Sequence, residues 1–302
     1  MSDSDSPPLI AGVELGGTKC VCVLATGPDD VREEVRLPTD SPETTLSAIR
    51  TVLERWTAGP GVSALGIASF GPLELDRDAA QFGHIVSTPK TGWSGADLNL
   101  LGEGLGVPIA IDTDVNGAAF AEARWGAAQG LTSYAYVTVG TGIGVGSIIG
   151  GRSVAGLGHS EAGHLRVGRL TGDNWPGWCP YHGDCVEGLA AGPAIALRAG
   201  RPGDELPGDD PAWEMAVHAL GGLLHNLVLT TAPQRILIGG GVVDGQPWLL
   251  PRLRAALLDS LAGYATAERI SAEGDAFVQP PGLGSRAGPL GAIALGLSAL
   301  KA

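Results

Sequence analysis

The sequence predicts an α/β protein built from two domains of related topology. Two strand–glycine-turn–strand units, at residues 9–25 and 133–151, open the two halves of the chain. Each unit is followed by alternating helical and extended patterns, and such alternation is typical of α/β folds. We place the boundary near residue 115. The smaller N-terminal domain then spans 1–115 plus a C-terminal helix at about 288–302, and the larger domain spans 116–287. A ligand is expected in a cleft between such domains.

The first half of the chain is expected to contain five strands and three helices. Residues 9–25 form two strands around the turn at Gly16 and Gly17, and the stretch VREEVRLP can form a third. A helix then begins at SPE (41–43), which supplies a capping serine, a proline at the first helical position and an acid in the first turn. The remaining elements are a strand at 62–71, a short helix at 96–106, a strand at 107–112 and a helix at 115–126.

The second half begins again with a strand, a glycine turn and a strand at 133–151. An irregular region follows from about 152 to 190. Apolar residues at helical spacing then predict a long helix at 213–232, which leads into a strand at 235–241. A further helix is expected at 247–263, and the apolar helix at 288–300 must pack against another element.

Charge and composition exclude several classes of partner. The chain of 302 residues has 32 acidic and 19 basic side chains and a formal net charge of −13. This acidity argues against nucleic acid or an anionic membrane surface as the main partner, although backbone amides can still hold an anion locally. The N-terminus MSDSDSPP lacks the features of a secretory signal, and no apolar stretch is long and uninterrupted enough to span a membrane. We therefore expect a soluble, cytoplasmic protein.

Glycine turns suggest a phosphate site. ELGGTK (14–19) and GTGIGVG (140–146) present several backbone N–H groups that no side chain shields, which suits phosphate oxygens. No GK dipeptide occurs, so there is no Walker A loop, and the second turn departs from G-x-G-x-x-G spacing. A single such hairpin is more often only a tight turn. The third glycine cluster, IGGGVV (238–243), favours the phosphate interpretation.

The heptapeptide CPYHGDC (179–185) predicts a zinc site. Cys179, His182 and Cys185 supply three ligands, and His164, fifteen residues before Cys179, supplies the fourth. Four protein ligands leave no open position for catalysis, so the zinc is expected to be structural and to hold the loop at 158–188. The alternative is two unligated thiols beside two chance histidines. The other cysteines, 20 and 22, alternate on a strand and are expected to be core residues.

These motifs together resemble the ROK family of bacterial sugar kinases, whose fold is similar to that of actin, hexokinase and the Hsp70 ATPase. ELGGTK resembles the first phosphate motif, GTGIGVG the second and ILIGGGVV the adenosine motif. IDTDVNGAAFAEARWG resembles the catalytic segment, and EAGH with CPYHGDCVEG resembles the zinc signature. GGTKCVC, SFGPL, STPKTGW and DTDVNGAA are most similar to bacterial zinc-containing fructokinases. The resemblance implies a two-domain actin/hexokinase-like (ribonuclease H-like) fold.

The resemblance implies that ATP, with Mg²⁺, phosphorylates a hexose, most simply D-fructose to D-fructose 6-phosphate. Such transfer needs a carboxylate that accepts the hydroxyl proton, and Asp114 matches the family's general base. Asp114 follows a strand and begins a helix, so its carboxylate can project into the cleft. Without the resemblance, helix capping by Asp112, Thr113 or Asp114 is the simpler interpretation.

Further residues are assigned through the same resemblance. Glu14 is expected to contact Mg²⁺ directly or through water. The residues assigned to the nucleotide are Glu14, Gly16, Gly17, Thr18, Lys19, Thr141, Gly142, Gly192, Pro193, Gly239, Gly240 and Gly241. The sugar side comprises Glu161, His164, Glu187, Thr113, Gly71 and Lys90. Glu14 stands where most relatives carry aspartate, which puts direct coordination of Mg²⁺ in doubt. Thr113 replaces an asparagine common in glucose-specific relatives, which weakens a glucokinase assignment.

Alternatives to a fructokinase are kept open. Glucose or mannose can be the preferred hexose on the same scaffold. A sugar-sensing repressor is a rival of another class, but only about eight residues precede the first strand, where a helix-turn-helix would be needed. A catalytically inactive sugar-binding protein is opposed by the phosphate motifs and Asp114. A homodimer is expected, with no nucleic-acid or membrane partner.

Overall fold

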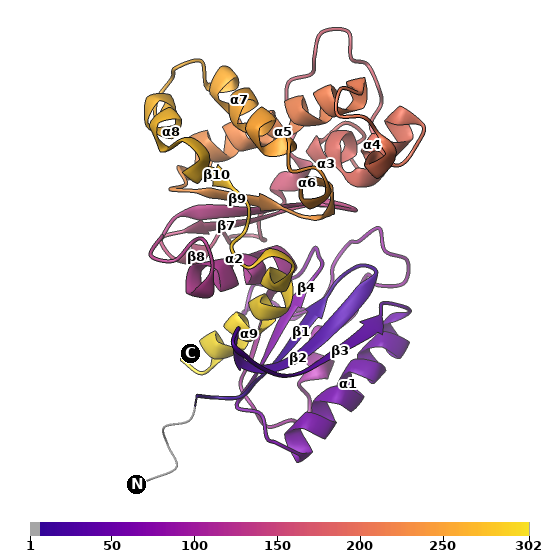
Figure 1. Cartoon of the computed structure of the whole chain (residues 1–302). Helices are drawn as coiled ribbons and strands as arrows, with labels where there is room; N and C mark the ends of the chain where they lie inside the picture. The colour runs from indigo at the N-terminus through magenta and orange to yellow at the C-terminus, as the bar shows by residue number, and fades with distance from the viewer. Residues whose placement is uncertain (1–6, 302) are drawn as a thin grey trace. The chain divides into compact units, whose positions relative to one another are not determined.

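The computed structural model describes residues 7–301, which form two compact units (Figure 1). Unit 1 contains the described residues through Gln129, Val154–His159 and the C-terminal segment from Ser285, and unit 2 contains Gly130–Ser153 and Ser160–Gly284. The change of unit after Gln129 lies beyond the expected boundary near 115, because helix α2 (Asp114–Trp125) packs against α9 and β4 of unit 1. The N-terminal stretch MSDSDS, on which the expectation about a secretory signal partly rests, lies outside the described residues.

Unit 1 is built on a five-stranded mixed sheet in the order β3-β2-β1-β4-β5. β1 pairs antiparallel with β2 and parallel with β4; β2 pairs antiparallel with β3, and β4 parallel with β5. The strands are β1 (Ile10–Leu15), β2 (Lys19–Gly27), β3 (Asp30–Pro38), β4 (Ala64–Ser69) and β5 (Ile109–Thr113). All five expected strands of this half are therefore present.

Unit 2 repeats this arrangement with the order β10-β9-β6-β7-β8. β6 pairs antiparallel with β7 and parallel with β9, as β1 pairs with β2 and β4 in unit 1. The strands are β6 (Tyr134–Val139), β7 (Ile143–Ile149), β8 (Arg152–Ser153), β9 (Ile236–Gly239) and β10 (Val278–Gln279). The prediction of two α/β domains with related topology is confirmed.

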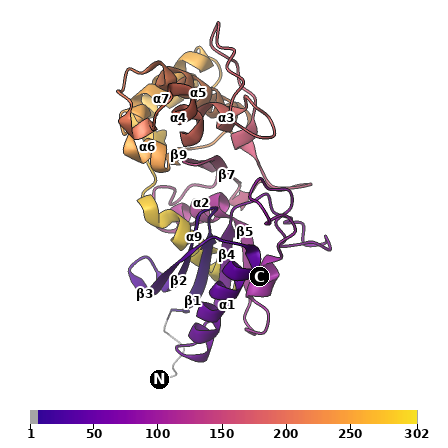
Figure 2. The same ribbon diagram turned by 90° about the vertical axis from the view of Figure 1, so that its right-hand side faces the viewer.

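Helices cover both faces of the sheet in unit 1 (Figures 1 and 2). On one face, α1 (Pro42–Ala58) packs its apolar positions against alternate residues of β1 and β2. The side chain of Ser41 accepts a hydrogen bond from the Thr44 N–H, so the predicted helix start is confirmed. On the other face, α9 (Ala287–Ala299) lies against β1, β2 and β4 and against α2. The expected helix at 96–106 is one turn of 3₁₀ helix, η1 (Leu98–Leu101).

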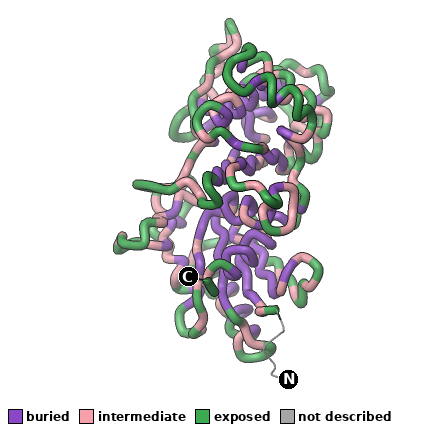
Figure 3. The backbone as a smooth tube through the Cα atoms, turned by 90° about the vertical axis from the view of Figure 1, so that its left-hand side faces the viewer, coloured by how far each residue is buried: buried purple, intermediate pink, exposed green. Residues whose placement is uncertain are grey.

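In unit 2 the helices pack on one face of the sheet, and the buried residues follow the strands and the inner sides of the helices (Figure 3). The expected helices are α5 (Pro211–Thr231) and α7 (Leu249–Leu261), which pack against each other. The region expected to be irregular contains η2 (Ala162–His164) and α3 (Val186–Ala190). Three α-helices were not indicated by the sequence patterns: α4 (Gly192–Ala199), α6 (Gly241–Gly245) and α8 (Ala267–Glu273). Short 3₁₀ turns also occur at η3 (Gly203–Glu205), η4 (Gly274–Ala276) and η5 (Gly284–Arg286).

Within the described part of the chain, no helix combines the length and the apolar character needed to cross a bilayer.

Candidate functional site

The first glycine turn connects β1 to β2 and is braced from behind by Thr39. The Gly16 N–H donates to the Lys19 carbonyl at 3.0 Å, which closes the turn. The buried Thr39 donates its N–H to the Thr18 carbonyl at 3.1 Å and its hydroxyl to the Gly16 carbonyl at 2.8 Å. Gly17, Thr18 and Lys19 are exposed, so their backbone and side-chain donors can reach an anion.

Asp114 is the first residue of α2, and Thr113, not Asp114, is its N-cap. The Thr113 hydroxyl accepts from the Asn116 N–H at 3.2 Å. The buried Asp112 carboxylate accepts from the Thr113 N–H and from the Asn116 side-chain amide, both at 2.7 Å. Thr113 is therefore the N-cap, and Asp114 Oδ1 accepts from the N–H of the adjacent Val115 at 2.8 Å.

Glu14, at the end of β1, is electrostatically coupled to Asp114. Burial, and next the negative charge of Asp114, raise the pKa of Glu14 from 4.5 to about 7, although Lys19 opposes the shift. A carboxyl group whose pKa is raised by burial and by a neighbouring negative charge favours a bound cation, because a divalent ion stabilises its charged form. The residues present therefore fit Mg²⁺ on the phosphate side of unit 1.

In unit 2, the predicted nucleotide residues gather at the carboxyl ends of β6 and β9. Because these two strands are parallel neighbours, the turn at 140–142 and the cluster at 239–241 lie at the same edge of the sheet. Gly192 joins them by donating its N–H to the Gly140 carbonyl at 2.8 Å, and Pro193 follows in the first turn of α4. Gly240 has a φ of 92°, and a Cβ there would lie 2.6 Å from the Thr138 hydroxyl and the Val139 carbonyl. Glycine is therefore required at position 240, because the backbone is left-handed there and no space remains for a Cβ atom.

Glu187, assigned to the sugar side, contacts this second glycine turn directly. Its Oε2 accepts from the Ile143 N–H at 3.0 Å and lies 2.7 Å from where a Cβ on Gly142 would be. Thr141, in the same turn, is exposed. Glu161 is also exposed, at the start of η2. The structure therefore brings Glu187 to Gly142 within unit 2.

The four predicted metal ligands converge. The ligand atoms of His164, Cys179, His182 and Cys185 all lie within 4.8 Å of one another. His164 Nδ1 is 3.6 Å from Cys179 Sγ and 3.5 Å from Cys185 Sγ, and His182 Nδ1 is 3.7 Å from Cys179 Sγ. Bonds of about 2.0–2.3 Å to a tetrahedral ion place ligand atoms at such mutual distances. Burial raises the pKa of Cys185 to about 11, so a cation is needed to hold this sulfur as a thiolate at neutral pH.

His164 presents its two ring nitrogens to two different groups. While Nδ1 faces the thiols, Nε2 lies 4.0 Å from Oε1 of Glu187. Metal-ligating histidines commonly direct their second nitrogen to a carboxylate, which fixes the orientation of both groups. The cluster of candidate metal ligands is thereby connected to the carboxylate assigned to the sugar. The remaining cysteines, Cys20 and Cys22, are fully buried in the core of unit 1, as expected.

Ion pairs centred on Asp173 also hold the loop that carries the candidate metal ligands. The Asp173 side chain is 5% exposed, accepts from the Arg198 and Arg169 guanidinium groups and also receives the Trp175 N–H at 3.3 Å. Arg169 in addition donates to Asp184, next to Cys185, at 3.0 Å. Burial of Asp173 opposes its ionisation, but the hydrogen bonds from the two arginines prevail and lower its pKa from 3.8 to about 2.

Asp173→Asn is expected to lower the free energy of unfolding at pH 7 by about 1–2 kcal/mol, a discounted figure because the arginines are partly solvated. A carboxyl whose pKa is lowered on folding contributes stability above pH 3.8, and this contribution is lost as the pH falls towards about 2. Urea unfolding of both proteins in EDTA, at pH 7 and near pH 2.5, measures the difference. An equal deficit at the two pH values would contradict the electrostatic origin.

Two supporting residues were missed by the sequence analysis. His159 Nε2 accepts from the Leu73 N–H at 2.9 Å and lies beside Gly71, whose bond to Pro72 is cis. The signal available for His159 was the first histidine of GLGHSEAGH, five residues before His164. No sequence signal indicated Thr39, because only folding brings it next to the turn at Gly16–Lys19. Lys90, expected on the sugar side, donates from Nζ to the Thr39 carbonyl at 3.2 Å, so its contact in this structure braces the first turn.

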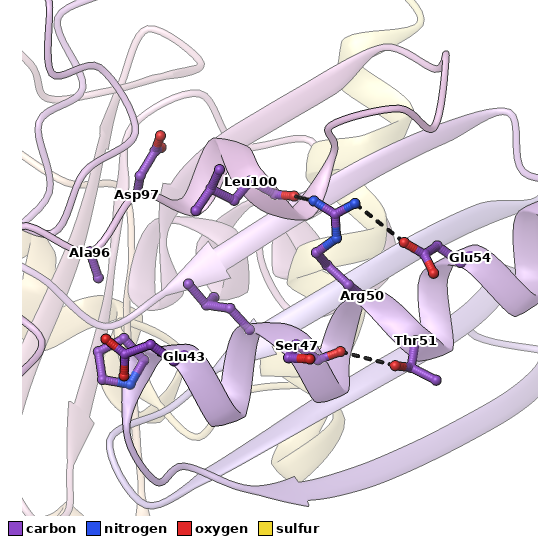
Figure 4. A pocket seen from close by; sticks show the side chains of 10 residues that line it. Glu43, Ser47, Arg50, Thr51, Glu54, Ala96, Asp97 and Leu100 are labelled. Carbon is purple, nitrogen blue, oxygen red and sulfur yellow. Dashed lines mark hydrogen bonds and ion pairs between the residues drawn. The ribbon is translucent and has the colours of Figure 1, made fainter.

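A surface pocket of about 400 Å³ in unit 1 has none of these residues in its lining (Figure 4). It is formed by α1 and the segment at 96–100. Arg50, the basic residue in its lining, donates to the Leu100 carbonyl at 2.9 Å and pairs with Glu54 at 3.3 Å. Because this charge is already engaged and Glu43 and Asp97 line the same pocket, it does not suit a phosphorylated ligand.

Comparison with known proteins gives matches over both units. The ROK family model matches residues 10–299. A fructokinase from Pediococcus pentosaceus is 37% identical over 97% of this chain and 99% of the relative, and one from Zymomonas mobilis is 39% identical over 95% and 96%. The crystal structure of a ROK family glucokinase from Streptomyces griseus, in complex with glucose and AMPPNP, matches with a TM-score of 0.74 at 25% identity, covering 96% of this chain and 99% of that one. The expected fold class is thereby confirmed.

Proposed function

The chain belongs to the ROK family, and from this we infer that it is a fructokinase, which transfers the γ-phosphoryl group of ATP to D-fructose and forms D-fructose 6-phosphate. The observation that carries the choice of sugar is the similarity to curated fructokinases, at 37% and 39% identity over nearly the whole chain. The glucokinase that was solved with glucose and AMPPNP is 25% identical. That complex supports ATP as the phosphoryl donor.

Asp114 is proposed as the general base. The sugar hydroxyl oxygen forms a bond to the γ-phosphorus, the bond from that phosphorus to the β–γ bridging oxygen breaks, and the hydroxyl proton passes to the Asp114 carboxylate. Thr113 supports this role by serving as the N-cap of α2, and Asp114 Oδ1 accepts from the Val115 N–H at 2.8 Å, which orients the carboxylate at the start of the helix. Asp112 and Asn116 hold the strand–helix junction from the buried side.

The phosphates are proposed to bind the backbone and side-chain donors of the two glycine turns, at Gly16–Lys19 in unit 1 and at Thr141–Gly142 in unit 2. Gly239, Gly240 and Gly241, with Gly192 and Pro193, are proposed to accommodate the adenosine. Mg²⁺, when bound, neutralises charge that develops on the transferring phosphoryl group, and Glu14 and Asp114 are the carboxylates that would hold it or its waters.

The sugar is proposed to bind Glu161, His164 and Glu187 in unit 2, together with Thr113, Gly71 and Lys90 of unit 1. We propose that a structural zinc ion binds His164, Cys179, His182 and Cys185. Its two thiolates balance the charge of the ion, and its four protein ligands complete the coordination. The zinc would fix the His164 ring, whose Nε2 faces Glu187. A cytoplasmic homodimer is also predicted, and light scattering of the purified protein measures its mass in solution.

Fructose is expected to give the highest kcat/KM among common hexoses. A coupled assay of ADP release over fructose, glucose, mannose, N-acetylglucosamine and N-acetylmannosamine measures this preference directly. A tenfold preference for another hexose would overturn the sugar assignment but retain a kinase. Absence of sugar-dependent ADP release across the panel would overturn the enzymatic proposal, and tight sugar binding without turnover would then favour a sugar sensor.

A further inference from the structure

Gly288, in the first turn of α9, lies directly against the carboxylate of Glu14. A Cβ atom at position 288 would lie 1.9 Å from Glu14 Oε1, 2.5 Å from Cδ and 3.0 Å from Oε2. No motif in the sequence indicated a role for this glycine, and its backbone lies outside the left-handed region that favours glycine. Space for the glutamate, and not backbone conformation, is therefore what this position requires.

The contact is the last of three in a regular row between β1 and α9. Alternate residues of β1 face α1, and the others, Ile10, Gly12 and Glu14, face α9. A Cβ on Gly296 would lie 2.3 Å from Ile10 Cγ2, and a Cβ on Gly12 would lie 2.9 Å from that of Ala292. Two strand residues and four helical residues both advance about 6–7 Å, so the register is kept from one pair to the next.

This row fixes where the Glu14 carboxylate lies. The strand holds the Glu14 backbone, and α9 forms the surface on which its side chain rests. The carboxylate is also close enough to Asp114 for the negative charge of Asp114 to act on it. A change at position 288 therefore reaches the carboxylate pair through Glu14.

We propose that Gly288 is a positioning residue for Glu14, and that its missing side chain allows a carboxylate as long as glutamate to occupy the phosphate side of unit 1 beside Asp114. The purpose of the Glu14 carboxylate rests on the proposed function. Its position rests on the packing of β1 against α9. An alanine at 288 would displace the carboxylate by about 1.5 Å to restore normal contact. The displaced atoms end a flexible side chain, so the fold is expected to survive.

The test is a double-mutant cycle of Gly288→Ala and Glu14→Asp. Gly288→Ala alone should lower kcat/KM for MgATP by about 10- to 100-fold, as misplacement by about 1 Å can cost 10²-fold. Its Tm should be unchanged or higher, since alanine is the better helix former. In the Glu14→Asp background the shorter side chain leaves room for the methyl group, so the same substitution should cost less than about threefold.

A second measurement does not depend on turnover. Calorimetric titration with ADP should show weaker binding for Gly288→Ala in the presence of Mg²⁺, and unchanged binding in EDTA. Gly291→Ala, one turn further along α9, is the contrasting variant. A Cβ there would meet backbone atoms of Gly117 and Ala118 at 2.5 Å and 2.7 Å, so this substitution should lower Tm.

Two outcomes would overturn the inference. One is a Gly288→Ala protein with the kinetics and the Mg²⁺-dependent ADP affinity of the wild type. The other is an equal loss in the wild-type and Glu14→Asp backgrounds, which would show that the glycine acts through another group. If the wild type phosphorylates no sugar, the proposed function fails, and the cycle measured on Mg²⁺-dependent ADP affinity still decides the role of Gly288.

Discussion

Asp114→Asn is expected to reduce kcat by about 10²- to 10⁴-fold while the affinities for ATP and fructose stay within a few-fold of the wild type. Asparagine keeps the shape of the side chain and much of its hydrogen bonding, but it cannot accept the hydroxyl proton. The stability of α2 should change little, because Thr113 is the N-cap and the asparagine Oδ1 can still accept from the Val115 N–H. Steady-state kinetics with separate titrations of sugar and nucleotide measure these effects.

Thr113→Ala tests the N-cap of α2 through the stability of the protein. This substitution removes the acceptor of the Asn116 N–H and should lower stability by about 0.5–2 kcal/mol, which thermal or urea unfolding detects. Asp114→Asn should leave the unfolding transition in place. A kcat for Asp114→Asn within a few-fold of the wild type would show that another group takes the proton.

Cys179→Ser is expected to lose zinc and to raise KM for fructose by about 10- to 100-fold, with nucleotide affinity largely kept. Cys179 Sγ contacts the Nδ1 atoms of both His164 and His182, so its loss releases both rings. His164 then no longer has a fixed orientation toward Glu187. Metal analysis, with sugar and nucleotide titrations of the same sample, measures the three quantities together.

The fold should survive this loss, because the bonds from Asp173 to Arg169 and Arg198 still hold the loop and each unit has its own core. Cys22→Ala is the matched control. It removes a buried thiol in unit 1, outside the ligand cluster, and should retain stoichiometric zinc. A Cys179→Ser protein without zinc but with an unchanged KM for fructose would show that the metal does not organise the sugar residues.

Local patterns in the sequence were sufficient for most of the fold. The alternation of strands and helices, the two glycine turns and the Ser41 cap depend on residues close together in the chain, so short-range patterns identify them. The convergence of the four candidate metal ligands was predictable for a similar reason, since three of the four lie within seven residues. The elements that were missed, such as α4 and α8, are short and follow turns, where apolar spacing gives little signal.

The sequence by itself determined the order of elements, the glycine turns and the four candidate metal ligands. Only the tertiary structure decided which of three adjacent residues caps α2, that Thr39 and Lys90 stand behind the first turn, and that Glu14 rests on Gly288. The physical reason is that each of these depends on contacts between segments far apart in the chain. The packing of β1 against α9 brings the two ends of the chain together. Local sequence propensities do not indicate where a side chain near one end will pack against a residue near the other.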